Sequence, residues 1–205
     1  MSGLKKSAIA IESSTLYLSY ITELTEAFRV QHIDFIDAPV VGSRPQADAG
    51  SLIFLAGGNE AVLDRARPAL SCMSSAIHHA GPNTTGTRMK LAVNAYFGIQ
   101  VAALSEIIGL LDKSNIAKDR AIELFNQLPV TSPALQGIGH LIMNNQFDPL
   151  FPIRLVEKDF RYAVNMSKSY RSEAPLANAA LGVYKKALKK GLDEKNINSI
   201  IQLYE

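Results

Sequence analysis

The sequence has little of what marks a disulfide-bonded, metal-binding or nucleic-acid-binding protein. Its 205 residues include one cysteine, Cys72, which excludes an intrachain disulfide and is typical of a reducing compartment. The four histidines and this cysteine show no metal-ligand spacing, and we interpret the adjacent His78 and His79 as structural residues of a strand. A formal net charge of +2 gives no basic stripe for nucleic acid.

Neither a signal peptide nor a clear membrane span is recognisable. The N-terminus, MSGLKKSAIAIESS, has two lysines but only a short apolar run. The most apolar segment, 91–111, is interrupted by polar residues, which favours a buried helix over a transmembrane one. With 47% apolar and 20% charged residues the chain can bury a substantial core, and we expect a cytoplasmic protein with no membrane partner.

The apolar pattern changes near residue 82. Before it, apolar runs alternate with amphipathic stretches, which predicts a parallel or mixed sheet with helices. Asn59 is the predicted N-cap of one of these helices, and Thr15 or Ser14 is the predicted N-cap of another. After it, strand patterns nearly vanish, and we expect an α/β domain over 1–84 and an all-α domain over 85–205. The predicted strands are 7–12, 33–41, 51–58 and 75–81; the predicted helices are 15–30, 59–70, 87–112, 117–128, 133–143, 153–170, 175–190 and 195–203.

Two polar residues interrupt the long apolar helix. Lys90 and Asn94 are four residues apart and therefore project from one helical face. We expect Lys90 to lie near the first turn, where the helix dipole and desolvation lower a lysine pKa and suit it to general acid–base chemistry on an alcohol or carbonyl. Asn94 could donate to the same oxygen. The alternative is a lysine that extends to solvent beside an incidental amide.

A glycine-containing turn follows the second predicted strand. In open α/β sheets ligands gather at the carboxyl ends of strands, and Gly42 lets the backbone of DAPVVGS approach a carboxylate. An ordinary connection is equally compatible with this segment. Asp37 is expected to brace the turn rather than to catalyse. Lys158 and Asp159, in EKDF, would by themselves indicate a surface ion pair.

Four blocks in this order resemble the β-hydroxyacid dehydrogenases, which include 3-hydroxyisobutyrate dehydrogenase, tartronate semialdehyde reductase and glyoxylate/succinic semialdehyde reductases. The blocks are ESST, DAPVVGSRPQADAGSLIFLAGG, GPNTTGTRMKLAVNAYFG and EKDF. The resemblance covers essentially the whole chain. It implies an NAD(P)-dependent oxidoreductase that transfers hydride between nicotinamide and a small 3-hydroxy acid or its aldehyde. It also implies a homodimer or higher homo-oligomer.

The resemblance assigns roles to individual residues. Lys90 matches the catalytic lysine that exchanges a proton with the substrate hydroxyl, and Asn94 matches the asparagine that positions the substrate. The turn of Val41, Gly42 and Ser43 matches the loop that holds the substrate carboxylate. At the cofactor, the matching residues are Thr15 and Lys158.

Some positions depart from the family pattern. The loop serine of the family is Val41 here, its second glycine is Ser43, and the middle glycine before the long helix is Thr84, so the substrate and the shape of that turn are open. The retained lysine favours hydroxyacid chemistry over that of the related imine reductases.

The G-x-G-x-x-G phosphate-binding fingerprint is absent from the sequence. The resemblance therefore implies the C-terminal half of a Rossmann-like domain followed by the helical domain, without a first βαβαβ half of about 80 residues. We expect impaired binding of NAD or NADP, and an exposed edge on strand 7–12 that pairs with a second copy. The alternative function is an inactive truncated remnant that serves only folding or oligomerisation.

Overall fold

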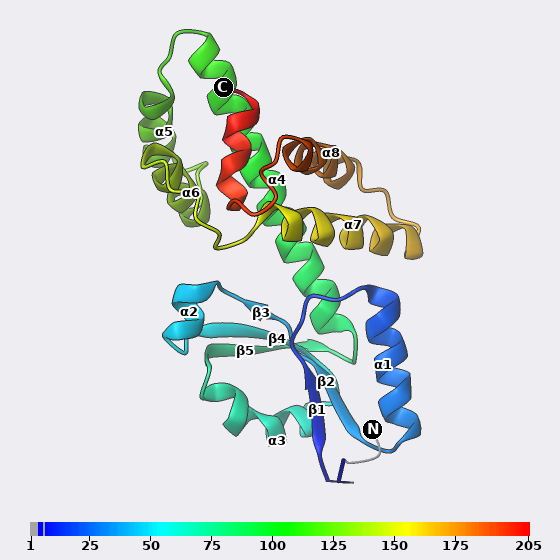
Figure 1. The fold of residues 1–205 in the computed structure, drawn as a ribbon. Helices are drawn as coiled ribbons and strands as arrows, with labels where there is room; N and C mark the ends of the chain where they lie inside the picture. Colours follow the sequence, from blue (N-terminus) through cyan, green and yellow to red (C-terminus); the bar gives the residue numbers. More distant parts are fainter. Residues whose placement is uncertain (1–3, 6) are drawn as a thin grey trace. The chain divides into compact units, whose positions relative to one another are not determined.

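A computed structural model describes residues 4–5 and 7–205 of the chain. The chain divides into two compact units, Met1–Val93 and Asn94–Glu205. The first is an α/β unit and the second is helical, which confirms the predicted fold class (Figure 1). The predicted domain boundary at 84/85 coincides with the start of the long helix α4 (Thr85–Lys113), whereas the division between the compact units falls inside that helix.

The first unit is built on a mixed five-stranded sheet with the order β1-β2-β4-β3, in which β5 also pairs with β4. β1 is parallel to β2, β5 is parallel to β4, and β3 runs antiparallel to β4. β1 is an edge strand, as the sequence predicted. Its pairing with a second copy stays a prediction. The strands are β1 (Ile9–Glu12), β2 (Asp34–Asp37), β3 (Val40–Val41), β4 (Leu52–Gly57) and β5 (Ser74–Gly81).

Alternation along β2 determines what covers each face of the sheet. Phe35 stacks on Phe28 of α1 (Leu18–Val30), with ring centroids 4.9 Å apart. Ile36 points to the opposite face, where it joins the apolar core that includes Leu63 and Leu70 of α3 (Glu60–Ser71). The two helices therefore cover opposite faces, and Asp37 lies on the same face as Phe35.

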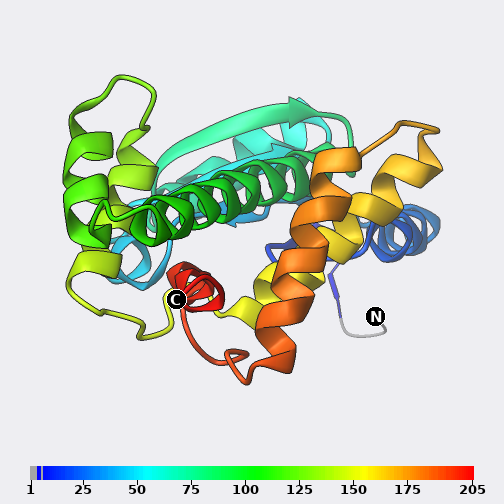
Figure 2. The same cartoon turned by 90° about the horizontal axis from the view of Figure 1, so that it is seen from above.

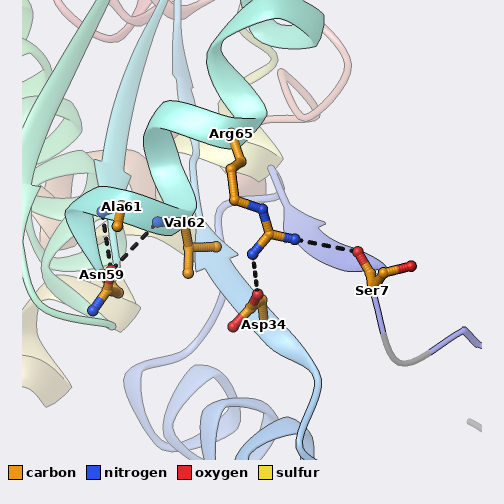
Figure 3. Close-up of polar contacts among 6 residues, drawn as sticks. All are labelled: Ser7, Asp34, Asn59, Ala61, Val62 and Arg65. Atoms are coloured by element: carbon orange, nitrogen blue, oxygen red, sulfur yellow. Dashed lines mark hydrogen bonds and ion pairs between the residues drawn. The ribbon is translucent and has the colours of Figure 1, made fainter.

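Polar contacts fix α3 to the sheet (Figure 3). The side chain of Asn59 accepts hydrogen bonds from the backbone N–H groups of Ala61 (3.0 Å) and Val62 (3.3 Å), which confirms it as the N-cap. Arg65 pairs with Asp34 at 2.6 Å and also donates to the carbonyl of Ser7 at 3.3 Å. Arg65 thus ties α3 to β2 and to the segment that enters β1.

Three sequence predictions need correction in this unit. The predicted strand 33–41 is two strands, because Pro39 cannot donate to a ladder and β3 turns to pair with β4. A short helix that was not predicted, α2 (Arg44–Asp48), lies between the predicted strands 33–41 and 51–58. Neither Ser14 nor Thr15 caps α1, because that helix begins at Leu18 and its N-cap position is Tyr17, which makes no side-chain cap bond.

The second unit consists of helices in adjacent pairs. Figures 1 and 2 show α5 (Lys118–Gln127) beside α6 (Pro133–Met143), and α7 (Ile153–Ser169) beside α8 (Pro175–Lys189). Pro133 and Pro175 are the first residues of their helices, where no intrahelical N–H is required. The last predicted helix is a 3₁₀ helix, η1 (Ile197–Leu203), instead of an α-helix.

A buried asparagine connects η1 to the loop before α7. The side-chain oxygen of Asn196 accepts from the N–H groups of Leu150 (3.2 Å) and Phe151 (2.8 Å), and its amide nitrogen donates to Asn198 at 2.7 Å. Asn196 is 2% exposed, so these bonds satisfy a polar group that water does not reach. The network explains why a terminal segment too short to be stable alone keeps a defined position.

By length and composition α4 would be able to cross a membrane, although half of its most apolar stretch is buried inside the structure. Within the second unit, its Val101, Leu104 and Ile108 are buried. Two glycines permit close packing: an added Cβ would lie 2.5 Å from Phe160 at Gly98 and 2.3 Å from Tyr204 at Gly109. These features describe the central helix of a packed bundle.

Candidate functional site

Lys90 is the sixth residue of α4 and is half-buried. The sequence prediction placed it near the first turn, but the helix begins at Thr85, so Lys90 lies in the second turn. Because the influence of the helix dipole is confined to the first turn, the dipole part of our expectation does not hold at this residue. Its four-residue spacing from Asn94 within one continuous helix puts both residues on one face, as predicted.

The start of α4 is held by Asp37, which ends β2. One carboxylate oxygen accepts the N–H of Thr84 and the other accepts the N–H of Thr87, each at 2.7 Å. Asp37 is fully buried. Burial raises the pKa of this carboxyl above its ordinary value, and the hydrogen bonds from Thr87 and Thr84 oppose that rise. We expected Asp37 to brace the turn that follows it. The structure shows that it caps a helix that starts 48 residues later in the chain, at Thr85.

The contact between α4 and the sheet is tight enough to require glycine on both sides. A Cβ at Gly57 would lie 2.5 Å from the Asp37 carboxylate, and one at Gly86 would lie 2.2 Å from the carbonyl of Leu55. Thr84, which replaces the glycine of the family pattern, has φ +76°, a conformation that costs a β-branched residue free energy. The turn therefore keeps a glycine-like backbone although the residue has changed.

The predicted substrate turn lies between β3 and α2. Val41 pairs with Ile53 of β4. Gly42 has φ +128°, and an added Cβ would lie 2.9 Å from Leu52, so this position requires glycine. The N–H of Ser43 donates to the side-chain oxygen of Gln46 at 2.9 Å. The Gln46 side chain therefore already accepts a hydrogen bond from one of the N–H groups that we expected to bind a carboxylate.

Thr15 is placed after the carboxyl end of β1. The N–H of Ala38 donates to the carbonyl of Glu12 at 2.8 Å, so the segment leaving β1 runs beside the segment leaving β2. Both strands are parallel, and their carboxyl ends meet at one edge of the sheet, where dinucleotides bind in this fold class. The structure brings the Thr15 segment to the same edge as Asp37, which holds α4.

In the second unit, three polar residues form a connected group. The amide nitrogen of Asn94 donates to one oxygen of Asp159 at 2.6 Å, and the ammonium of Lys158 lies 3.2 Å from the other oxygen. Asn94 is 8% exposed and Asp159 is 3% exposed, whereas 27% of the Lys158 side chain is exposed. The ion pair expected between Lys158 and Asp159 is present, but it is not a surface pair, because the carboxylate is buried and also accepts from Asn94.

Sequence reasoning missed Asp159, although a signal was present. Along α7, Ile153, Val156, Phe160 and Ala163 are buried at helical spacing, and Asp159 falls on the same stripe. A carboxylate on an apolar stripe needs a buried partner, since an unpaired buried charge is costly. The polar interruption of α4 at Asn94 was the matching signal.

Gly98 explains how α7 comes close enough to α4 for this contact. It lies one turn after Asn94 and faces the ring of Phe160, which follows Asp159 in sequence. Phe160 stacks on Tyr184 of α8 with centroids 5.2 Å apart, and the Tyr184 hydroxyl donates to the carbonyl of Gly98 at 2.9 Å. The missing side chain at Gly98 thus sets the spacing at which Asp159 reaches the amide.

Comparison with solved structures first identifies the fold class of the protein. Solved structures of 3-hydroxyisobutyrate dehydrogenases have the same fold. That of the enzyme from Mycobacterium tuberculosis, solved with L-serine, has a TM-score of 0.90 and 25% identity, over 98% of this chain and 72% of that one. The one from Salmonella typhimurium has a TM-score of 0.88 and 22% identity, over 98% and 70%. The fold is therefore that of the 3-hydroxyisobutyrate dehydrogenases.

Sequence comparison is more specific. Residues 84–204 match the family described as NAD-binding of NADP-dependent 3-hydroxyisobutyrate dehydrogenase, and residues 1–81 match the NAD binding domain of 6-phosphogluconate dehydrogenase. Glyoxylate/succinic semialdehyde reductase 1 of Arabidopsis thaliana is 30% identical over 94% of this chain and 66% of its own length. The mitochondrial 3-hydroxyisobutyrate dehydrogenase of Drosophila melanogaster is 29% identical over 98% and 64%.

The chain belongs to the β-hydroxyacid dehydrogenase family, as the resemblance of its four sequence blocks implied. It spans about two thirds of the length of these two curated relatives.

Proposed function

We propose that the protein is an NAD(P)-dependent oxidoreductase that interconverts a small 3-hydroxy acid and its aldehyde. Family membership supports this proposal, as does a relative named for the dehydrogenation of 3-hydroxyisobutyrate; relatives named for the reduction of other small aldehydes support the reaction type. The observation that carries it is the Asn94 amide, which a buried carboxylate orients on the helical face that Lys90 shares. Asp159 satisfies the amide nitrogen of Asn94 and fixes its orientation, so the amide is held in place before a ligand binds.

The proposed chemistry at this face is proton exchange. Lys90 donates a proton to the oxygen of an aldehyde substrate during reduction and takes it back in the reverse direction. Because Asp159 accepts one N–H of Asn94, the amide cannot rotate freely, and its remaining polar atoms keep one direction toward the substrate oxygen. Asn94 thus orients the substrate while Lys90 carries the proton.

The substrate carboxylate is proposed to bind at the turn of Val41, Gly42 and Ser43. Gly42 is exposed, and no other residue fits there because an added Cβ would meet Leu52 and Gln46. The side-chain oxygen of Gln46, which accepts the Ser43 N–H, occupies the position that a carboxylate oxygen would take. Binding there requires the Gln46 side chain to move, which a surface side chain can do at small cost.

One position in each unit is proposed to contact a nicotinamide cofactor. Thr15 follows a parallel strand at the edge where dinucleotides bind, and α1 begins three residues after it, at Leu18. Lys158 has a partly exposed side chain whose ammonium lies 3.2 Å from Asp159, and a cation of this kind is suited to a phosphate or amide group. Bound there, the nicotinamide would supply or accept the hydride.

The test of the catalytic proposal replaces Lys90 with methionine. Loss of a general acid–base group is expected to lower kcat by about 10²–10⁴-fold in oxidation of 3-hydroxyisobutyrate with NADP⁺ or NAD⁺. Lys113→Met is the matched control, since Lys113 is an exposed lysine in the last turn of the same helix. Equal turnover in both variants would refute the role of Lys90.

Cofactor binding is tested separately, by titrating the chain with NADH and NADPH and following nicotinamide fluorescence. Saturable enhancement that Lys158→Ala weakens would support the proposed contacts. An absence of binding at millimolar cofactor would overturn the enzymatic proposal for this chain.

Self-association is also proposed, through one face of α4. Tyr96, Ile107 and Leu110 recur at helical spacing within the second unit and are 68%, 40% and 62% exposed. A face of this kind is typical of an interface between copies. Light scattering of the wild type and of Leu110→Glu tests it: a wild-type monomer at high concentration, or an oligomer unaffected by the substitution, contradicts the proposal.

A further inference from the structure

Asp37 lies where the two chain segments proposed to meet the substrate come together. It is the last residue of β2, and five residues later the chain reaches the turn at Gly42. Its carboxylate binds the start of α4, the helix that carries Lys90. The two attachments are 47 and 50 residues away in sequence, so this single side chain links distant parts of the first unit.

The attachment defines both the position and the rotation of the helix start. Two oxygens of one rigid carboxylate bind N–H groups three residues apart, each at 2.7 Å. The amide of Asn83 adds a bond to the carbonyl of Phe35 at 2.8 Å, and the contact between Gly57 and Gly86 leaves no room for the helix to shift toward the sheet. A helix held at two points in its first turn can neither slide nor rotate easily.

The consequence at Lys90 follows from helix geometry. Lys90 is three residues beyond Thr87, an axial distance of about 4.5 Å, so a displacement of the helix start reaches the lysine almost undiminished. The turn at Gly42 is connected to Asp37 along the chain, because β3 (Val40–Val41) follows β2, which ends at Asp37. Asp37 therefore controls how the lysine and the turn lie relative to each other.

We propose that Asp37 is a positioning residue for the reaction: it sets the place of Lys90 relative to the turn formed by Val41, Gly42 and Ser43. The inference rests on the proposed function of Lys90. A misplacement of about 1 Å at a reacting group can cost on the order of 100-fold in rate. Asp37→Asn, which keeps the volume but turns one acceptor into a donor facing an N–H, is expected to displace the helix start.

The experiment compares Asp37→Asn with Asn59→Ala, a matched loss of a helix cap in the same unit. The cap at Asn59 lies at the start of α3 (Figure 3). This helix covers the face of the sheet opposite to the face on which Asp37 lies. At a temperature where both variants are folded, Asp37→Asn is expected to lower kcat by about 10–100-fold with little change in KM for the cofactor, whereas Asn59→Ala keeps the wild-type kcat. Equal kcat for the two variants, per folded molecule, would overturn the proposal.

A second readout is independent of activity. Amide exchange at Thr84 and Thr87 is expected to accelerate, and the backbone amide resonance of Lys90 to move, in Asp37→Asn but not in Asn59→Ala. If the wild type shows no turnover, the proposed function fails for this chain, and these NMR measurements still decide whether Asp37 positions Lys90. Unchanged exchange and an unmoved Lys90 resonance overturn it. If Asp37→Asn does not fold, Asp37→Ser, which keeps one small acceptor, takes its place.

Discussion

The contact between Asn94 and Asp159 allows the sharpest quantitative test. The amide nitrogen and the carboxylate oxygen are 2.6 Å apart and both residues are buried. Hydrogen bonds to charged groups contribute about 1.5–3 kcal/mol, and a buried group left without its partner costs about 1–3 kcal/mol. We expect Asn94→Ala and Asp159→Ala each to lower the free energy of unfolding by about 2–3 kcal/mol.

The double mutant separates the contact from the packing of each side chain. If the pair is coupled, Asn94→Ala/Asp159→Ala loses less stability than the sum of the single variants, with a coupling free energy of about 1.5–3 kcal/mol. Urea unfolding followed by circular dichroism at 222 nm measures it. Arg120→Ala is the control, because its ion pair with Glu123 is exposed on both sides and should contribute less than about 1 kcal/mol. If the losses in free energy of unfolding of the two single variants add within about 0.5 kcal/mol, the claim that Asp159 fixes the Asn94 amide is refuted.

Three further predictions concern the packing and the helix start. Gly98→Ala places a methyl group against Phe160 and should cost about 1–3 kcal/mol in urea unfolding, and an unchanged stability would contradict the close helix contact. Thr84→Gly relieves a positive φ and should raise the free energy of unfolding by roughly 0.5–1 kcal/mol, whereas a loss of stability would show that the threonine is not strained. Because the pKa of Asp37 is raised in the folded state, its contribution is fully present below its unfolded pKa of 3.8 and is lost as pH rises through the raised value. The stability of the wild type relative to Asp37→Asn should therefore decrease across that window in urea titrations at successive pH values, and a constant difference would refute the shift.

Several parts of the fold were predictable from local pattern alone. The apolar spacing of α5, α6 and α8 located them within a few residues, and Pro133, Pro175 and Asn59 correctly indicated helix starts, because capping and proline chemistry act over one turn. The start of α1 was misplaced for the opposite reason: Ser14 and Thr15 have the right chemistry for a cap, but the chain after β1 continues extended as far as Tyr17.

In the candidate site, too, some residues were predictable from local sequence and one was not. Lys90 and Asn94 were found because a cation and an amide on an apolar helix are conspicuous, and the turn at Gly42 because glycine marks unusual backbone. The role of Asp159 was missed, since its partner lies 65 residues away and a neighbouring lysine suggested a simpler pairing.

The sequence by itself determined which residues are helical, which are extended, and which family the chain resembles, because these depend on neighbours within a turn or two. The tertiary structure alone decided that the Asp37 carboxylate holds the start of α4 and that Asp159 orients the amide of Asn94. Both contacts exist because glycines at positions 57, 86 and 98 let backbone and side chains approach, and a missing side chain in a sequence does not reveal what fills its space.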